Sequence, residues 1–202
     1  MDIFLLNWNP TAYHDFTEED VLDFANRASR GEKLNVMNWS TGSRKSGINR
    51  GDQVMFLRQG TNRRGLIARG IAVSEIYEGE HWADSKRMAN YVDWEPIDFL
   101  SIDDRLPTEN LIEATNEIDW NMLLGSGVKL PDGDAEIVTN LWDSWYGNTH
   151  YDEGLTDSAL AIYIGKSMLG NLETAIQNNV WGCPVPQNAE LDKGDLILFC
   201  GG

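Results

Sequence analysis

The chain has 202 residues, enough for one domain of ordinary size and a smaller second unit. Its hydrophobic content of 42% and its eight tryptophans are ample for a packed core, which excludes general disorder. The formal net charge of −16 excludes indiscriminate nucleic-acid binding, because so acidic a protein repels a polyanion. No apolar run is as long as a membrane span and no leader opens the chain, so we expect a soluble, cytoplasmic protein without a membrane partner.

The first forty residues have the pattern of a strand, a helix and a second short strand. Residues 3–8 are apolar and run into an Asn-Pro turn, which predicts a strand. Thr17 precedes three acidic residues, a favourable helix start, and an apolar face then continues to the Ser-Arg-Gly at 29–31. Residues 36–39 are a short apolar piece, and a flexible segment at 41–47 follows them.

Residues 48–76 predict a β-hairpin, because apolar runs at 54–57 and 66–76 flank a polar loop bounded by glycines. A strand is expected at 91–94, stopped by Pro96, with a continuation over 97–100 after a bend as the alternative. A short helix begins near Leu106, and the loop at 125–131 has room for one short strand. The last helix of this part begins at Asp134 and has one apolar face, formed by Ile137, Val138, Leu141, Trp142 and Trp145.

The polar, glycine-containing residues 147–157 predict a linker, so we place the first domain at 1–146. Beyond the linker, residues 191–199 repeat the order of residues 48–56: apolar, polar, basic, Gly, Asp, then a strand with Phe at the same step. We therefore predict a partial second copy over 158–202. Since a strand without partners leaves backbone groups unpaired, we favour a natural chain that continues further. The alternative is a half-copy that completes a sheet on the first domain or on a second molecule.

Residues 44–69 carry a local excess of positive charge. They hold one acid, Asp52, and seven basic residues: Arg44, Lys45, Arg50, Arg58, Arg63, Arg64 and Arg69. Arginine suits bidentate contacts with phosphates and base edges, and such contacts weaken with salt. The sequence therefore indicates a phosphate-binding patch, with a merely solvated hairpin as the alternative.

An ordered set of motifs across residues 1–146 resembles the EVE domain, a member of the PUA-like superfamily to which YTH and ASCH domains also belong. The motifs are Trp-Asn-Pro at 8–10, Trp-Ser-Thr-Gly at 39–42, Gly-Asp-Gln-Val-Met-Phe-Leu-Arg-Gln-Gly at 51–60, Gly-Leu-Ile-Ala-Arg-Gly at 65–70, His-Trp at 81–82 and Tyr-Val-Asp at 91–93. The single motifs are weak, since Gly-Asp-x-Val opens strands in many small barrels, whereas the ordered set is specific.

The resemblance implies an α+β, PUA-like (EVE-type) fold: a partly open β-barrel with flanking helices, and a pocket for a single, often modified nucleobase. Relatives of this version often stand at the front of prokaryotic proteins that carry an HNH-type nuclease. That association implies a place in a modification-dependent defence or restriction system, with a C-terminal effector domain or partner protein. It assigns no chemistry to these 202 residues.

A flipped base needs stacking surfaces, polar atoms for its edge and cations for the flanking phosphates. We expect the base pocket at eight residues: Trp8, Asn9, Trp39, Ser40, Arg58, Gln59, His81 and Trp82. Phosphate contacts are expected from four: Arg44, Lys45, Arg63 and Arg64. Core packing is the alternative for each of the three tryptophans, whereas Trp142 and Trp145 follow helical spacing and are assigned to the core.

The sequence does not predict an enzyme. The three histidines are scattered, and no zinc-deaminase, zinc-protease or phosphate-loop motif is present, so His81 is a weak candidate for a general base. Cys183 and Cys200 lack metal-ligand spacing, and reduced, buried thiols are favoured over a disulfide. We expect no cofactor and no metal.

These features predict a binding module that reads a modified, for example methylated, base in nucleic acid, with DNA favoured over RNA. The same pocket suits a free nucleotide or another planar ligand, which would make the chain a sensor. The arginine cluster favours the polymer, and the net charge of −16 keeps the small ligand open. The oligomeric state is left open.

Overall fold

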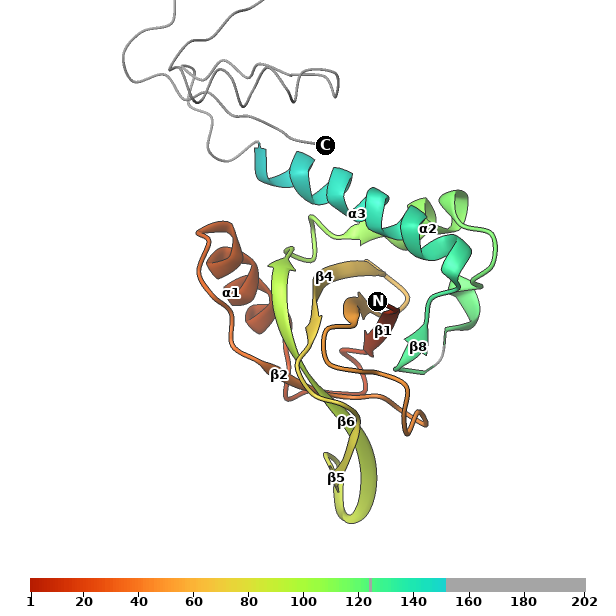
Figure 1. Cartoon of the computed structure of the whole chain (residues 1–202). Helices are drawn as coiled ribbons and strands as arrows, with labels where there is room; N and C mark the ends of the chain where they lie inside the picture. Colours follow the sequence, from red (N-terminus) through yellow and green to blue (C-terminus); the bar gives the residue numbers. More distant parts are fainter. Residues whose placement is uncertain (124, 152–202) are drawn as a thin grey trace, which may run out of the picture. The chain divides into compact units, whose positions relative to one another are not determined.

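The computed structural model describes residues 1–123 and 125–151, which form a curled mixed sheet with three α-helices packed on it (Figure 1). The expected partial copy at 158–202, most of the expected linker and both cysteines lie outside the described residues. The helices are α1 Glu18–Ser29, α2 Thr108–Ala114 and α3 Asp132–Tyr151, with a 3₁₀ turn at Trp120–Met122.

The described strands belong to one sheet: β1 Ile3–Trp8, β2 Met37–Ser40, β3 Gln53–Arg58, β4 Gly65–Ala72, β5 Tyr77–His81, β6 Asp84–Phe99, β7 Leu106–Pro107 and β8 Val128–Lys129. Their main order is β2-β6-β4-β3-β1-β8, with β5 paired to β6 and β7 paired to β4. β1 runs parallel to β3, and the other pairs are antiparallel. This curled half-barrel is α+β and fits the PUA-like fold that the motifs imply.

The two faces of the sheet bury separate cores, because successive side chains of a strand point to opposite faces. In β1, Phe4, Leu6 and Trp8 belong to the core that also contains side chains of α1. Ile3 and Leu5 belong to the core beneath α2 and α3. β3 divides its residues in the same way, and all six of them are buried since both faces are covered.

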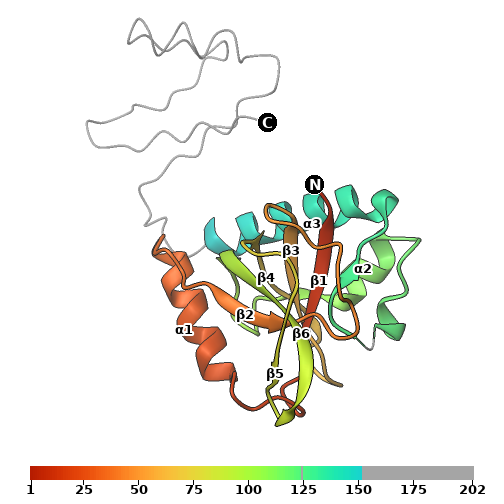
Figure 2. The same ribbon diagram turned by 60° about the horizontal axis from the view of Figure 1, so that its bottom comes forward.

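The strands β1 and β2, whose ribbons are drawn in Figure 2, are not paired with each other in the sheet. Side-chain hydrogen bonds and a loop join them instead. The Trp39 indole N–H donates to the Asn7 carbonyl at 3.0 Å. The loop before β8 reaches the same place, where the Ser126 hydroxyl accepts from the Asn7 N–H at 3.1 Å. Gly127 has a φ of +77°, and a Cβ there would lie 2.5 Å from the Thr41 carbonyl oxygen, so a larger residue would push the loop away.

The helix starts follow from local chemistry. Thr17 caps α1 as expected, and a capping box with Asp20 satisfies both backbone donors there. Asp134, in the first turn of α3, is buried and accepts from three backbone N–H groups of the segment after α2. Burial alone would raise the pKa of Asp134, but these three donors outweigh it and lower the pKa. The start of α3 is thereby fastened to residues 116–118.

The predicted strand at 91–94 is part of a longer strand, because β6 continues through Pro96 to Phe99. Pro96 lies opposite Gly70 at a register shift of the β4–β6 pair, where the ladder is already irregular and tolerates the missing N–H.

The predicted linker begins too early, since α3 includes residues 147–151. Gly147 alone does not end the helix, because one glycine costs only about 1 kcal/mol relative to alanine. Thr149 supports this last turn of α3, because its hydroxyl donates to the carbonyls of Trp145 and Tyr146.

Candidate functional site

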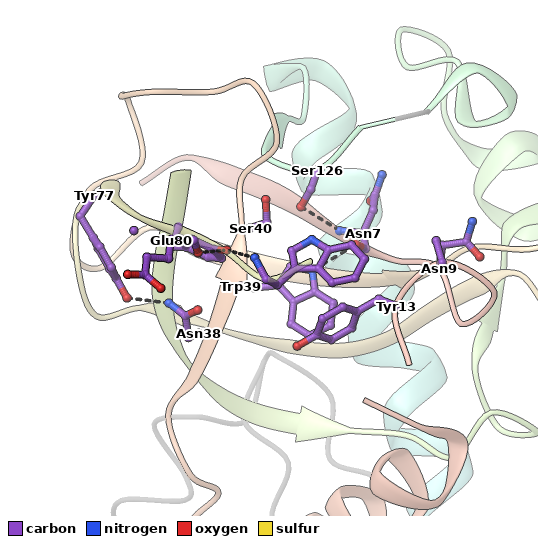
Figure 3. A pocket seen from close by; sticks show the side chains of 13 residues that line it. Asn7, Asn9, Tyr13, Asn38, Trp39, Ser40, Tyr77, Glu80 and Ser126 are labelled. Carbon is purple, nitrogen blue, oxygen red and sulfur yellow. Dashed lines mark hydrogen bonds between the residues drawn. The ribbon is translucent and has the colours of Figure 1, made fainter. Parts of the chain in front are cut away.

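A cavity of about 560 Å³ opens between the ends of β1 and β2 and the β5–β6 hairpin (Figure 3). Its lining is Asn7, Asn9, Ala12, Tyr13, Asn38, Trp39, Ser40, Tyr77, Gly79, Glu80, Trp82, Tyr91 and Ser126. In Figure 1 the hairpin projects from the sheet on the side away from α3. The volume lies in the usual range for small-ligand sites.

The turn after β1 brings an aromatic ring to the mouth of the cavity. The Asn9 carbonyl accepts from the N–H groups of Ala12 and Tyr13, both at 3.0 Å. The Asn9 side-chain oxygen accepts from the N–H and the hydroxyl of Thr11, at 3.1 and 2.8 Å. This Asx-type turn follows from the Asn-Pro pair and returns the chain so that Tyr13 lies beside Trp39.

Three rings form one wall of the cavity. Tyr13 packs edge-on against Trp39, with centroids 5.3 Å apart at 80°, and against Trp82, with centroids 4.9 Å apart at 88°. Trp39 is 8% exposed and held by its bond to Asn7, whereas Trp82 is 47% exposed. An exposed indole at a cavity mouth has apolar surface to offer a ligand.

Two further tyrosines line the side formed by the hairpin. The Tyr77 hydroxyl donates to Asp93 at 2.7 Å and accepts from the Asn38 amide at 2.6 Å. The Tyr91 hydroxyl donates to the Glu80 carbonyl at 2.8 Å and accepts from the Trp82 N–H at 3.1 Å. Burial, with the neighbouring Asp93 carboxylate, raises the pKa of Tyr77 to about 12. Tyr77 is therefore neutral at physiological pH.

Polar residues of β1 and β2 are also part of the cavity lining. The Asn7 amide nitrogen donates to the Gly125 carbonyl, while its Oδ1 is buried and has no hydrogen-bond partner among the described residues. The Ser40 hydroxyl oxygen accepts from the Gly42 N–H at 3.1 Å and has its own proton left to donate. Asn7 was not predicted from the sequence, although an amide within an otherwise apolar strand was a usable signal.

Four of the eight expected base-pocket residues line this cavity: Asn9, Trp39, Ser40 and Trp82. Trp8 is fully buried in the core, where it packs edge-on against Phe16 at 5.1 Å. Gln59 donates to the Leu123 carbonyl at 2.9 Å. His81 does not line the cavity, but it stacks on Trp82 with centroids 5.4 Å apart and so supports that indole.

Arg58 lies apart from the cavity as the centre of a buried network. Its guanidinium pairs with Glu18 at 2.7 Å and donates to the carbonyls of Asn62 and Arg63. It also lies over the Trp8 ring, 5.9 Å from the centroid. Arg58 thus ties the β3–β4 loop to the start of α1.

The expected phosphate contacts are mostly engaged within the protein. Arg44 donates to the Gly127 carbonyl and lies over the Phe4 ring at 5.2 Å. Arg63 pairs with Glu18 at 2.9 Å and with Asp103 at 3.6 Å. Arg64 donates to the Trp120 carbonyl, and burial lowers its pKa.

Arg50 is exposed in the turn before β3, and three further exposed cations lie in the loop after β2 and on β6. Lys45 is exposed in the loop that follows β2, and Lys86 and Arg87 are exposed on β6 near the hairpin turn. Within residues 1–123 and 125–151, the side chains of all three are without an ion pair.

Neither a metal centre nor a membrane-spanning element occurs in the part of the chain that the structure describes. No group of three or more His, Cys, Asp or Glu side chains there is placed to hold a metal ion. No helix there combines the length and the apolar character needed to cross a bilayer. The His81 ring nitrogen Nδ1 accepts from the Ala83 N–H at 3.1 Å, which stabilises the hairpin turn.

Comparison with known proteins identifies a solved structure with the same fold. No protein-family model matches the sequence, and no curated protein matches it. A solved structure of a hypothetical protein from Leishmania major superposes with a TM-score of 0.50 at 12% identity, covering 71% of this chain and 96% of that one. The chain shares its fold with that protein. An identity this low supports nothing about function.

Two other solved structures resemble the chain more loosely. One is human THYN1 in complex with DNA containing 5-methylcytosine, with a TM-score of 0.47 at 13% identity, covering 70% of this chain and 97% of that one. The other is the YTH domain-containing protein mmi1 with RNA, with a TM-score of 0.37 at 14% identity, covering 69% of this chain and 80% of that one. Similarity at this level is too weak to carry an argument about the site.

Proposed function

We propose that this chain is a nucleic-acid-binding module whose cavity holds a single modified base. The observation that carries the proposal is the cavity itself, which combines a wall of three aromatic rings with polar atoms that have hydrogen-bonding capacity left. A base removed from its stack needs aromatic surface to replace its stacked neighbours, and it needs partners for its hydrogen-bonding edge. Both are present within one small volume.

The roles follow from the contacts. Trp82, half exposed and supported by the His81 ring, is the stacking surface, and Trp39 and Tyr13 close the wall behind it. The Ser40 hydroxyl, whose oxygen accepts from Gly42 and whose proton is left over, donates to an acceptor on the base edge.

Backbone phosphates are met by the exposed cations Lys45, Lys86 and Arg87, which have no acidic partner in the described part of the chain. This contact is local and modest, consistent with the overall charge of −16. On the resemblance of the motifs, we place DNA before RNA. We also assign the module to the recognition part of a modification-dependent defence protein whose effector lies on another domain or partner.

The second candidate is a sensor of a free nucleotide or another planar ligand. It is favoured by one observation: Arg58, Arg63 and Arg69, the core of the basic stretch, are each paired with an acid of the same chain. Since these cations are neutralised, the case for a polymer rests on fewer charges than the sequence implied.

Equilibrium binding of fluorescent single-stranded oligonucleotides, with and without a modified base, tests the proposal. Trp82→Ala should weaken binding of the modified oligonucleotide by one to two orders of magnitude, since a stacked base contributes about 1–3 kcal/mol. Met88→Ala is the matched control, because Met88 is also an exposed apolar residue of the hairpin but does not line the cavity.

Unchanged affinity in a folded Trp82→Ala protein would contradict the assignment. The salt dependence separates the two candidates. A polymer with several phosphate contacts loses affinity steeply as salt rises, a free nucleotide with one phosphate group loses much less, and an uncharged planar ligand is nearly indifferent to salt.

A further inference from the structure

The cavity has a marked chemical bias. Five of its lining residues are aromatic: Tyr13, Trp39, Tyr77, Trp82 and Tyr91. Among the described residues that line it, Glu80 alone bears a formal charge, and no lysine or arginine is among them. A cavity of aromatic faces with one carboxylate is the environment that proteins use for cations, because each ring presents a negative face to a positive charge.

Glu80 is free to act on a ligand. It is exposed, and its carboxylate has neither an ion pair nor a hydrogen bond with any residue of 1–123 or 125–151. Its backbone is fixed, since its carbonyl accepts from the Tyr91 hydroxyl at 2.8 Å. In Figure 3 the carboxylate lies on the side of the cavity formed by Tyr77 and Asn38.

A second carboxylate lies behind that side. Asp93 accepts from the Tyr77 hydroxyl at 2.7 Å and from the Asn38 amide at 3.1 Å. Its negative charge is therefore directed at two of the lining residues, and it makes the Tyr77 ring a better partner for a cation. An anionic group placed here would meet two like charges, which disfavours a ligand phosphate inside the cavity.

We propose that the cavity selects a nucleobase that carries a positive charge because a ring nitrogen is alkylated, such as N1-methyladenine or N3-methylcytosine. The inference rests on the proposed function and names the class of modification. The charge of such a base is spread over a planar ring, so it can face the indoles and the carboxylate at once. Entry of the cation is opposed by desolvation, which the rings and Glu80 offset together.

Methylated bases that are isomers in their neutral forms test the inference, because they carry the same methyl group on the same base and differ in charge through one bound proton. N1-methyladenine is cationic at neutral pH, and N6-methyladenine is neutral. N3-methylcytosine and 5-methylcytosine form the second such pair. Fluorescence anisotropy with the full chain and single-stranded oligonucleotides of one sequence should show about tenfold tighter binding of the cationic member of each pair, equivalent to about 1.4 kcal/mol.

The role of the carboxylate is tested by Glu80→Gln, which keeps the shape and removes the charge. The preference for the cationic isomer should fall to about threefold or less, while the neutral isomers bind as before. Glu78→Gln is the matched control, because Glu78 is an exposed acid of the same strand that does not line the cavity. Its preference should equal that of the unchanged protein.

Equal affinity for the two isomers of each pair, or tighter binding of the neutral ones, would overturn the selection for charge and leave the proposed function in place. Failure of all four modified oligonucleotides to bind better than the unmodified strand would overturn both. A trimethyl-lysine peptide that binds more tightly than any of the oligonucleotides would show that the cation site serves a protein tail and would also overturn the inference.

Discussion

The basic stretch around β3 and β4 and the cavity beside β5 use their polar side chains in opposite ways. In the basic stretch, most of the arginines bind partners within the protein: Arg58 pairs with Glu18, and Arg69 pairs with Asp98 at 2.6 Å and with Asp143. In the cavity, the Asn7 oxygen and the Glu80 carboxylate have no partner in the described part of the chain. In this chain the dense charge of the basic stretch mainly stabilises the fold, whereas unmet hydrogen-bonding capacity lies beside the cavity, and for this reason we propose the ligand site there.

The largest effect expected from this contrast is on stability, at the buried arginine. Arg58→Ala should lower the free energy of unfolding by about 3 kcal/mol, since it leaves the Asn62 and Arg63 carbonyls without their charged donor and leaves Glu18 paired with Arg63 alone. Urea unfolding measures the loss, with Lys45→Ala as an exposed control that should change stability by less than about 0.5 kcal/mol. The folded variant should still bind the modified oligonucleotide when affinity is measured at urea concentrations well below the unfolding midpoint. A tenfold loss of affinity under these conditions would show that Arg58 belongs to the ligand site.

The ion pairs of Glu18 should make a smaller contribution to the free energy of unfolding, and this contribution depends on pH. Burial alone would raise the pKa of Glu18, but its bonds to Arg58 and Arg63 outweigh burial and lower the pKa. A depressed pKa in the folded state means that the stabilisation is present above the pKa of the unfolded chain and is lost as pH falls through the folded value.

The unfolding free energy should therefore decline below about pH 4.5, by about 1 kcal/mol for this half-exposed group. The Glu18→Gln variant should not show this decline. The unfolding free energies of the variant and of the unchanged protein, plotted against pH, should therefore converge in acid. A constant gap between them from pH 7 to pH 3 would show that the ion pair contributes nothing.

The smallest effect concerns the exposed cations. If Lys45 contacts one phosphate, Lys45→Ala should reduce the slope of log affinity against log salt by roughly one unit and weaken binding at physiological salt only severalfold. Arg63→Ala should leave the slope unchanged, because that guanidinium is paired with Glu18 and Asp103. If Arg63→Ala reduced the slope and Lys45→Ala did not, Arg63 would be a phosphate contact as the sequence predicted. The basic stretch would then serve binding as well as the fold.

The local elements were predictable because short-range chemistry decides them. The apolar run of β1, the Thr17 cap and the hairpin of β3 and β4 each follow from neighbouring residues. Pro96 predicted an end to the strand, whereas β6 continues through it. The reason lies in the register: Pro96 is paired with Gly70 at an irregular point of the ladder, where the missing N–H is tolerated.

The site was harder to predict, since its walls come from four separate segments. Trp39 and Trp82 stood out as tryptophans beside polar residues. Tyr77 and Tyr91 gave no such signal. They lie 14 residues apart in the sequence, and only the pairing of β5 with β6 places them opposite each other. The basic stretch misled for the same reason: the acids that neutralise Arg58 and Arg69 lie 29 to 74 residues away. Such partners are set by the curl of the sheet and leave no local signal.

The central claim, that the base enters the aromatic cavity, is tested most directly by fluorine NMR of the protein labelled with 5-fluorotryptophan, with resonances assigned by single Trp→Phe variants. On addition of an oligonucleotide with a modified base, the resonances of Trp39 and Trp82 should shift, since both line the cavity. Those of Trp8 and Trp142, fully buried in the two cores, should not. Saturable binding that leaves the Trp39 and Trp82 resonances in place would contradict the account.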